Sequence, residues 1–278
     1  MSQFCYCMRQ MFGSVPRNDV TLFYTACIDE TGTSGQSPYV IVAGGLTLNE
    51  QWDYFESAWG NLLSKYHVEL FHAKEFNGSI GDFSGWSRLK RERFVKAQKK
   101  IIDQASLVSV AVAVESKTHR EIKQQMRGVS GFLARSDYGL CFSFLRIMIC
   151  DQLAKGHPDS KLRLIVEDGP YSSGAAKIYT DVRKTIGAKY RPAPHADMLN
   201  GFGILPKGSL RGLEVADYFA DKAIVDLRSG AFKTEVQTRS IRAKLTPTIL
   251  ERWYNGMIKE KEHRKKLNRS GFTGGSNS

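Results

Sequence analysis

The chain has 278 residues, of which 42% are hydrophobic, and its mean hydropathy is −0.32. This composition is typical of a folded globular protein and excludes a predominantly disordered chain. No apolar run is long enough to cross a membrane or to form a signal peptide, so the sequence predicts a cytoplasmic protein without a membrane partner. The formal net charge of +12 favours a polyanionic partner, and nucleic acid is the partner that we expect.

The five cysteines are few, odd in number and irregularly spaced, at positions 5, 7, 27, 141 and 150. This pattern does not suit a disulfide framework, and Cys5 and Cys7 lack the second pair of ligands that a zinc site needs. We interpret Cys27, Cys141 and Cys150 as small buried hydrophobic residues in a reducing compartment.

The first half of the chain predicts two strands followed by a helical insertion. Residues 1–20 contain Gly and Pro breakers and are expected to form an irregular arm. Thr21–Asp29 and Tyr39–Leu46 are apolar, β-branched runs that we expect to pair as a hairpin, with a bulge or close approach at Gly44-Gly45. Residues 47–105 are interpreted as the insertion, because their apolar residues recur at helical spacing.

The second half alternates strands with helices. Strands are expected over Leu107–Glu115, Leu162–Glu167 and His195–Ile204, and helices over Ser136–Leu153, Gly174–Ile186 and Leu210–Arg228. Strands joined closely would be antiparallel and strands joined by helices parallel, which predicts an α/β domain over 21–236 with a mixed five-stranded sheet flanked by helices. Residues 237–267 are expected to be a basic helical segment and 268–278 a disordered tail.

Three acidic signatures stand where carboxylates could share one site. They are Asp29-Glu30 and Glu167-Asp168, each at the end of an apolar strand, and Glu214 with Asp217 in the last helix of the domain. Carboxylates brought together in a partly buried place repel one another unless a cation compensates them. The pattern therefore predicts a divalent-metal centre, and with it phosphodiester chemistry, since Mg²⁺ prefers oxygen ligands.

Each signature also has a plainer interpretation. Asp29 and Asp168 precede Gly-containing turns and could be turn formers, and the acidic stripe of the helix could be solvated. Neighbouring residues on a strand point to opposite faces, so only one of Glu167 and Asp168 can face the site, and we choose Asp168. His72, in the extended run LFHAKEF, could act in acid–base chemistry or be structural, and Lys74 could hold a phosphate.

The ordered set of IDETG, ELFHAKEF, VEDG and EVADYFAD resembles the domain of unknown function 3800 family, over roughly Leu22–Leu227. That family is placed in the ribonuclease H-like superfamily, so the resemblance implies a ribonuclease H-like fold and a metal-dependent nuclease using Mg²⁺ or Mn²⁺. Asp29, Asp168 and Asp217 match the superfamily's carboxylates, with Glu30 as a further expected ligand.

The resemblance leaves some points open. His72 and Lys74 match the family's His-x-Lys/Asp segment and are expected catalytic residues. The superfamily's second carboxylate has no clear counterpart, and the candidates are Asp137, Glu115, Glu30 and Glu75.

Basic residues gather in Arg88–Lys100, Lys189–Arg191 and Arg239–Arg269, where they could track a phosphate backbone. Two other functions remain open, a non-catalytic nucleic-acid-binding module of the same fold and an actin-like ATPase-type phosphotransferase. The second is disfavoured because an extra residue separates Asp29 from Gly32, and no second Gly-rich phosphate loop is found. Whether the chain is a monomer or a homodimer is left open.

Overall fold

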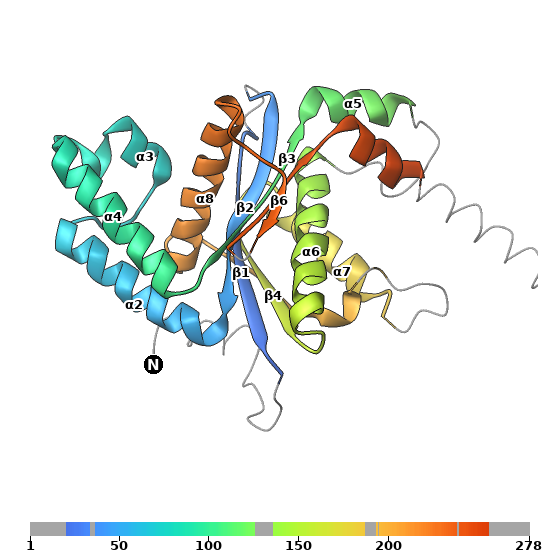
Figure 1. The fold of residues 1–278 in the computed structure, drawn as a ribbon, viewed down its shortest axis with the longest axis horizontal. Helices are drawn as coiled ribbons and strands as arrows, with labels where there is room; N and C mark the ends of the chain where they lie inside the picture. The colour runs from blue at the N-terminus through green and yellow to red at the C-terminus, as the bar shows by residue number, and fades with distance from the viewer. Residues whose placement is uncertain are drawn as a thin grey trace, which may run out of the picture.

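A mixed sheet of seven strands, in the order β5-β4-β1-β2-β3-β7-β6, forms the centre of the chain (Figure 1). The computed structural model describes residues 21–33, 37–125, 136–186, 193, 195–237 and 239–255. The predicted arm, the basic cluster Lys189–Arg191 and the predicted tail lie outside these residues. The strands are β1 (Phe23–Thr31), β2 (Tyr39–Leu48), β3 (Val108–Glu115), β4 (Lys161–Glu167), β5 (Leu199–Leu205), β6 (Glu235–Gln237) and β7 (Ser240–Leu245).

The directions of the first five strands confirm the expectation drawn from their connections. β1 and β2 pair antiparallel, as do β2 and β3, whereas β4 runs parallel to both β1 and β5. β1 and β2 approach closely at Gly44, where a side-chain Cβ would overlap the carbonyl oxygen of Cys27. Only glycine fits this position in the hairpin.

The prediction of five strands was wrong, and so was that of a helix over residues 237–245, the first part of the expected basic helical segment. β7 pairs parallel with β3 and antiparallel with β6, and both strands extend the sheet past residue 236. In β7 the residues Ile241, Ala243 and Leu245 are buried, whereas the intervening residues are partly exposed. This period of two is that of a half-buried strand. Residues 247–255, the last that the structure describes, are helical, in agreement with the prediction for that part of the chain.

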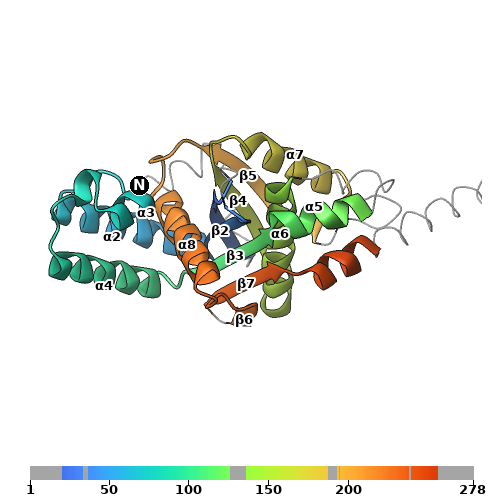
Figure 2. The ribbon, with the colours of Figure 1, turned by 90° about the horizontal axis from the view of Figure 1, so that it is seen from above.

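Helices cover both faces of the sheet (Figure 2). The helices are α2 (Asn49–Tyr66), α3 (Ala73–Gly78), α4 (Arg88–Gln104), α5 (Ser116–Gln125), α6 (Asp137–Gly156), α7 (Ser172–Arg183) and α8 (Arg211–Arg228), with 3₁₀ turns η1 (Gly81–Phe83) and η3 (Ala196–Met198). α6 and α7 lie on one face, and α8 lies on the other with α2, α3 and α4 outside it. The expected helical insertion between the second and third strands is therefore present.

Each face has its own hydrophobic core. Ala26, Ile28, Leu164 and Val166 pack on the α6 face, whereas Cys27 and Ile165 belong to the core under α2 and α8. Cys27, Cys141 and Cys150 are free and buried, as predicted. Within the described residues, no helix combines the length and the apolar character needed to cross a bilayer.

Candidate carboxylate site at the ends of β1 and β4

Asp29 and Glu167 are neighbours on the face of the sheet that α8 covers. The parallel register places Ile28 opposite Val166, so the next residues along the two strands, Asp29 and Glu167, stand side by side. Side chains two residues apart on a strand share a face, and Cys27 and Ile165 both pack under α8. The two carboxylates therefore point toward the helix.

Asp217 brings a third carboxylate to this place from α8. Its Oδ2 accepts a hydrogen bond from the backbone N–H of Ala73 at 2.9 Å and lies 3.8 Å from Nδ1 of His72. Nζ of Lys207, just beyond the end of β5, lies 4.0 Å from the same oxygen and 3.8 Å from Oε1 of Glu167. Three carboxylates, a histidine and a lysine thus meet at one end of the sheet.

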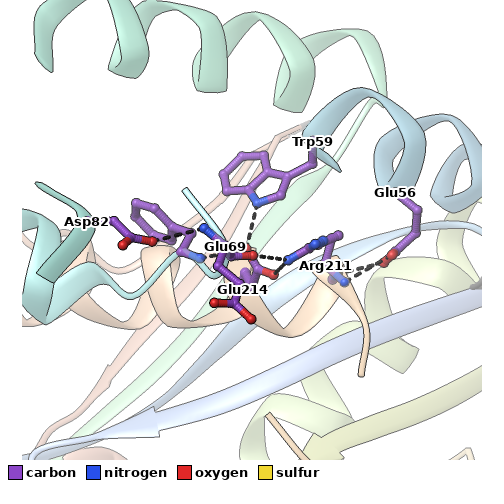
Figure 3. Close-up of polar contacts among 8 residues, drawn as sticks. Glu56, Trp59, Glu69, Asp82, Arg211 and Glu214 are labelled. Carbon is purple, nitrogen blue, oxygen red and sulfur yellow. Dashed lines mark hydrogen bonds and ion pairs between the residues drawn. The ribbon is translucent and has the colours of Figure 1, made fainter. Parts of the chain in front are cut away.

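A network of buried polar groups holds α8 against residues 67–73, the segment that joins α2 to α3 (Figure 3). Oε2 of Glu214 accepts hydrogen bonds from the indole N–H of Trp59 and from the backbone N–H of Phe71, both at 3.0 Å. Together with the bond from Ala73 to Asp217, this holds the backbone on both sides of His72. The two carboxylates of α8 at i and i+3 therefore position the histidine.

The first turn of α8 is held by a carboxylate from α2. Glu56 accepts hydrogen bonds from the backbone N–H groups of Arg211 at 3.0 Å and Gly212 at 2.8 Å, which have no partner within the helix. The Arg211 guanidinium pairs with Glu214 and also donates to the carbonyl of Glu69 at 3.1 Å (Figure 3). This fixes the start of the helix that carries Asp217.

The electrostatics of the site follow from burial and from like charges. The pKa of Asp29 is raised well above its usual value by burial, and then by Asp217, Glu167 and Glu30. Burial and the charge of Glu167 raise the pKa of Glu30 to about 7. Burial likewise raises the pKa of Glu167, which Lys207 and His72 oppose and Asp217 reinforces. The cluster is therefore short of positive charge despite the lysine.

The structure does not bring all the expected site residues together. Asp168 is exposed and accepts a hydrogen bond from the Ser172 hydroxyl at the start of α7, so Glu167 takes the place that we assigned to it. Glu30 follows Asp29 on β1 and therefore points to the opposite face, toward α6. Lys74 is exposed on α3, and no described hydrogen bond or ion pair joins it to the cluster.

The other candidates for a further carboxylate lie elsewhere. Asp137 pairs with His119 at 2.5 Å at the start of α6, and Glu115 accepts a hydrogen bond from Thr118. Glu75 lies on α3. Lys207 was not singled out from the sequence, because nothing in its PKGS turn shows that the end of β5 lies beside that of β4.

The carboxylate oxygens of Asp29, Glu167 and Asp217 are the kind of ligand that a hard cation prefers. In the described part of the chain, no three His, Cys, Asp or Glu side chains are arranged closely enough to hold a metal ion. Mg²⁺, however, keeps several waters and is often held by one or two carboxylates. Oε2 of Glu167 is buried without a hydrogen-bond partner among the described residues, which leaves it free to accept a proton or bind a cation. Asp29 and Asp217 could hold such a cation.

Comparison with known proteins gives no relative. No protein-family model matches the sequence, and neither a curated protein nor a solved structure matches the chain. The resemblance to the domain of unknown function 3800 family stays a prediction from the motifs.

Proposed function

We propose that this protein is a divalent-metal-dependent phosphodiesterase that hydrolyses nucleic acid. The observation that carries the proposal is the meeting of Asp29, Glu167 and Asp217 at one end of the sheet, where burial and mutual repulsion raise the pKa values of Asp29 and Glu167. Such a site gains free energy by taking up a cation. A ribonuclease H-like arrangement is consistent with the mixed sheet and its antiparallel second strand.

Asp29 and Asp217 would hold Mg²⁺ or Mn²⁺, which supplies activation of a water molecule and neutralises charge on the phosphate. Glu167 would accept a proton from the attacking water, because its Oε2 has no hydrogen-bond partner among the described residues and burial raises its pKa. Lys207 places a positive charge beside the same carboxylates, where a phosphate oxygen would also be attracted. His72 borders this space and could orient the water.

The overall charge supports a polyanionic substrate. Exposed basic side chains follow the outer helix α4, namely Arg88, Arg93, Lys96, Lys99 and Lys100. A surface of this kind attracts a phosphate backbone without reading its sequence. The acidic cluster and the basic helix together favour a nuclease over a metal site with an uncharged substrate.

The test measures Mn²⁺ binding by calorimetry and cleavage of labelled DNA and RNA in the same samples, with EDTA as the blank. Asp29→Asn is the test variant, because its amide oxygen can still accept the hydrogen bond from the backbone N–H of Glu30. Asp181→Asn is the matched control, since Asp181 lies in an exposed i,i+4 pair on α7. We expect the first variant to lose both binding and cleavage and the control to keep both.

Two results would contradict the proposal. Absence of Mn²⁺ binding by the wild-type protein would exclude the metal site. Nucleic-acid binding without cleavage, unchanged in Asp29→Asn, would indicate a non-catalytic binding module instead.

A further inference from the structure

A second polar site lies on the opposite face of β1, where α5 and α6 begin. A cavity of about 520 Å³ is bounded by the β1–β2 turn and the first residues of both helices. Its described lining includes the hydroxyl-bearing Thr33 and Ser116, the cationic Lys117 and Arg120, and the ring of Tyr171. This volume falls within the range of small-molecule binding sites, about 300–1,000 Å³.

The charge of the lining favours an anion. Lys117 belongs to an exposed i,i+4 pair with Glu121 at 3.9 Å, a geometry that holds the ammonium weakly, and Arg120 has no ion pair with a described residue. The carboxylate in the lining, Asp137, is already engaged, because it pairs with buried His119 and accepts a hydrogen bond from Ser116. Burial alone would raise the pKa of Asp137, but these partners together with Lys123 outweigh it and lower the pKa, so they offset the charge of the carboxylate.

The cavity continues into a second hollow of about 360 Å³. The two share Ser116, Arg120 and Asp137, and Lys123 adds a further basic residue to the second. We call the two hollows together the α5 trough. Because two hollows adjoin and basic residues line both of them, the trough suits a chain with repeated phosphates better than a single compact anion.

An aromatic wall adds a surface for a flat group. The ring of Tyr171 stacks on that of Tyr138, with centroids 5.1 Å apart and planes inclined by 20°. Tyr138 is buried, so this stack fixes the orientation of the more accessible Tyr171 ring. A nucleic-acid base could stack on such a ring without regard to its identity.

The trough also adjoins the carboxylate site. Consecutive residues of β1 point to opposite faces of the sheet. Asp29 points toward α8, whereas Glu30 points toward Tyr138 on α6. The charges of Glu30 and Asp29 contribute, after burial, to raising the pKa of Tyr138. The trough and the carboxylates therefore flank the same end of β1.

We infer that the α5 trough binds single-stranded nucleic acid, with Lys117 and Arg120 holding backbone phosphates and Tyr171 stacking on a base. The inference rests on the proposed function, since it specifies that the nucleic-acid substrate is single-stranded where it lies near the carboxylates. A free mononucleotide carries the same chemical groups, and the experiment separates the two.

The test measures fluorescence anisotropy of a labelled twelve-residue oligothymidylate in EDTA, so that no cleavage intervenes. The test variant is Lys117→Gln/Arg120→Gln. Its control is Lys177→Gln on α7 combined with Lys184→Gln at the C-cap of that helix, which removes the same charge and likewise includes a lysine of an exposed i,i+4 pair. We expect the test variant to bind about tenfold or more weakly and the slope of log K against log salt to fall by about 1.4, whereas the control stays near wild type.

Two further arms identify the ligand. Tyr171→Leu is expected to weaken oligothymidylate binding severalfold, whereas Tyr171→Phe keeps it. Unlabelled thymidine monophosphate should displace the oligomer only at concentrations at least a hundredfold higher than unlabelled oligomer requires. Equal potency of the two would overturn the assignment to a strand, and equal loss of binding in the test and control variants would overturn the site.

The outcome is independent of metal chemistry. If Mn²⁺-dependent cleavage is absent but oligothymidylate binding depends on Lys117 and Arg120, the proposed function fails and the trough stands. If cleavage occurs and the double variant binds and cleaves like the wild type, the trough fails and the proposed function stands.

Discussion

Neutralising Glu30 should stabilise the protein at alkaline pH. The Glu30 side chain is partly buried, and burial first, then the charge of Glu167 at the end of the neighbouring strand, raises its pKa from 4.5 to about 7. At about 1.4 kcal/mol for each pH unit, this difference corresponds to about 3 kcal/mol. The change Glu30→Gln removes the charge and keeps the shape of the side chain.

The sign of the effect follows from proton linkage. Between pH 4.5 and about 7 the folded protein holds the proton of Glu30 while the unfolded chain has released it. The stability of the wild type therefore falls as pH rises through this window and is fully reduced above it. The Gln side chain does not titrate, so the variant should match the wild type near pH 4.5 and exceed it at pH 8 by up to about 3 kcal/mol, or about 6 °C in Tm.

Urea unfolding at pH 4.5 and pH 8, in EDTA, measures this difference. Glu92→Gln is the control, because the Glu92 side chain is 55% exposed and forms an i,i+4 pair on α4. Its effect should stay within about 0.5 kcal/mol at both pH values. If Glu30→Gln were no more stable than the wild type at pH 8, or gained as much stability at pH 4.5, the raised pKa of Glu30 would not be what destabilises the folded protein.

Two other substitutions test the site and the network behind it. Initial rates of metal-dependent cleavage are measured on one labelled oligonucleotide. Glu167→Gln should lower the rate by about a hundredfold, whereas Asp168→Asn should leave it near the wild-type value. The reverse order would show that Glu167 does not take part in the mechanism. Trp59→Phe removes the indole N–H that donates a hydrogen bond to Glu214 in the buried network. Urea unfolding should show that the free energy of unfolding falls by about 1–3 kcal/mol. A fall no larger than that caused by an exposed substitution would contradict the role of this bond.

The sequence predicted the first five strands because their apolar runs are long and their connections are distinctive. β1 and β2 read as a hairpin, and β4 and β5 as strands linked through helices. β7 was missed because Arg242 and Lys244 alternate with its buried residues, so the segment looked like part of a basic helix. Pairing with the edge of β3 decides its conformation, and a sequence-distant partner of that kind leaves no local signal.

The choice between Glu167 and Asp168 could not be made from the sequence for a related reason. Both faces of β4 are covered, because Leu164 belongs to the core that includes α6 and α7 and Ile165 to the core that includes α2 and α8, so both residues are apolar. A strand without polar alternation does not show which of its residues face a given helix. The register with β1 supplies that information, because it sets Glu167 beside Asp29.

The acidic stripe of α8 illustrates how a structural role and a chemical role combine in one residue. The repulsion expected among its carboxylates is relieved because each one has a different partner. Glu214 accepts from Trp59 and Phe71, Asp217 from Ala73, and Asp221 from the Asn77 amide at 2.6 Å. Asp217 is the member that also meets β1 and β4, so the contacts that anchor segment 67–73 set its position beside Asp29. A substitution that removes the hydrogen bonds of Glu214 should therefore displace Asp217 from Asp29 and Glu167, although Glu214 does not itself belong to the carboxylate site.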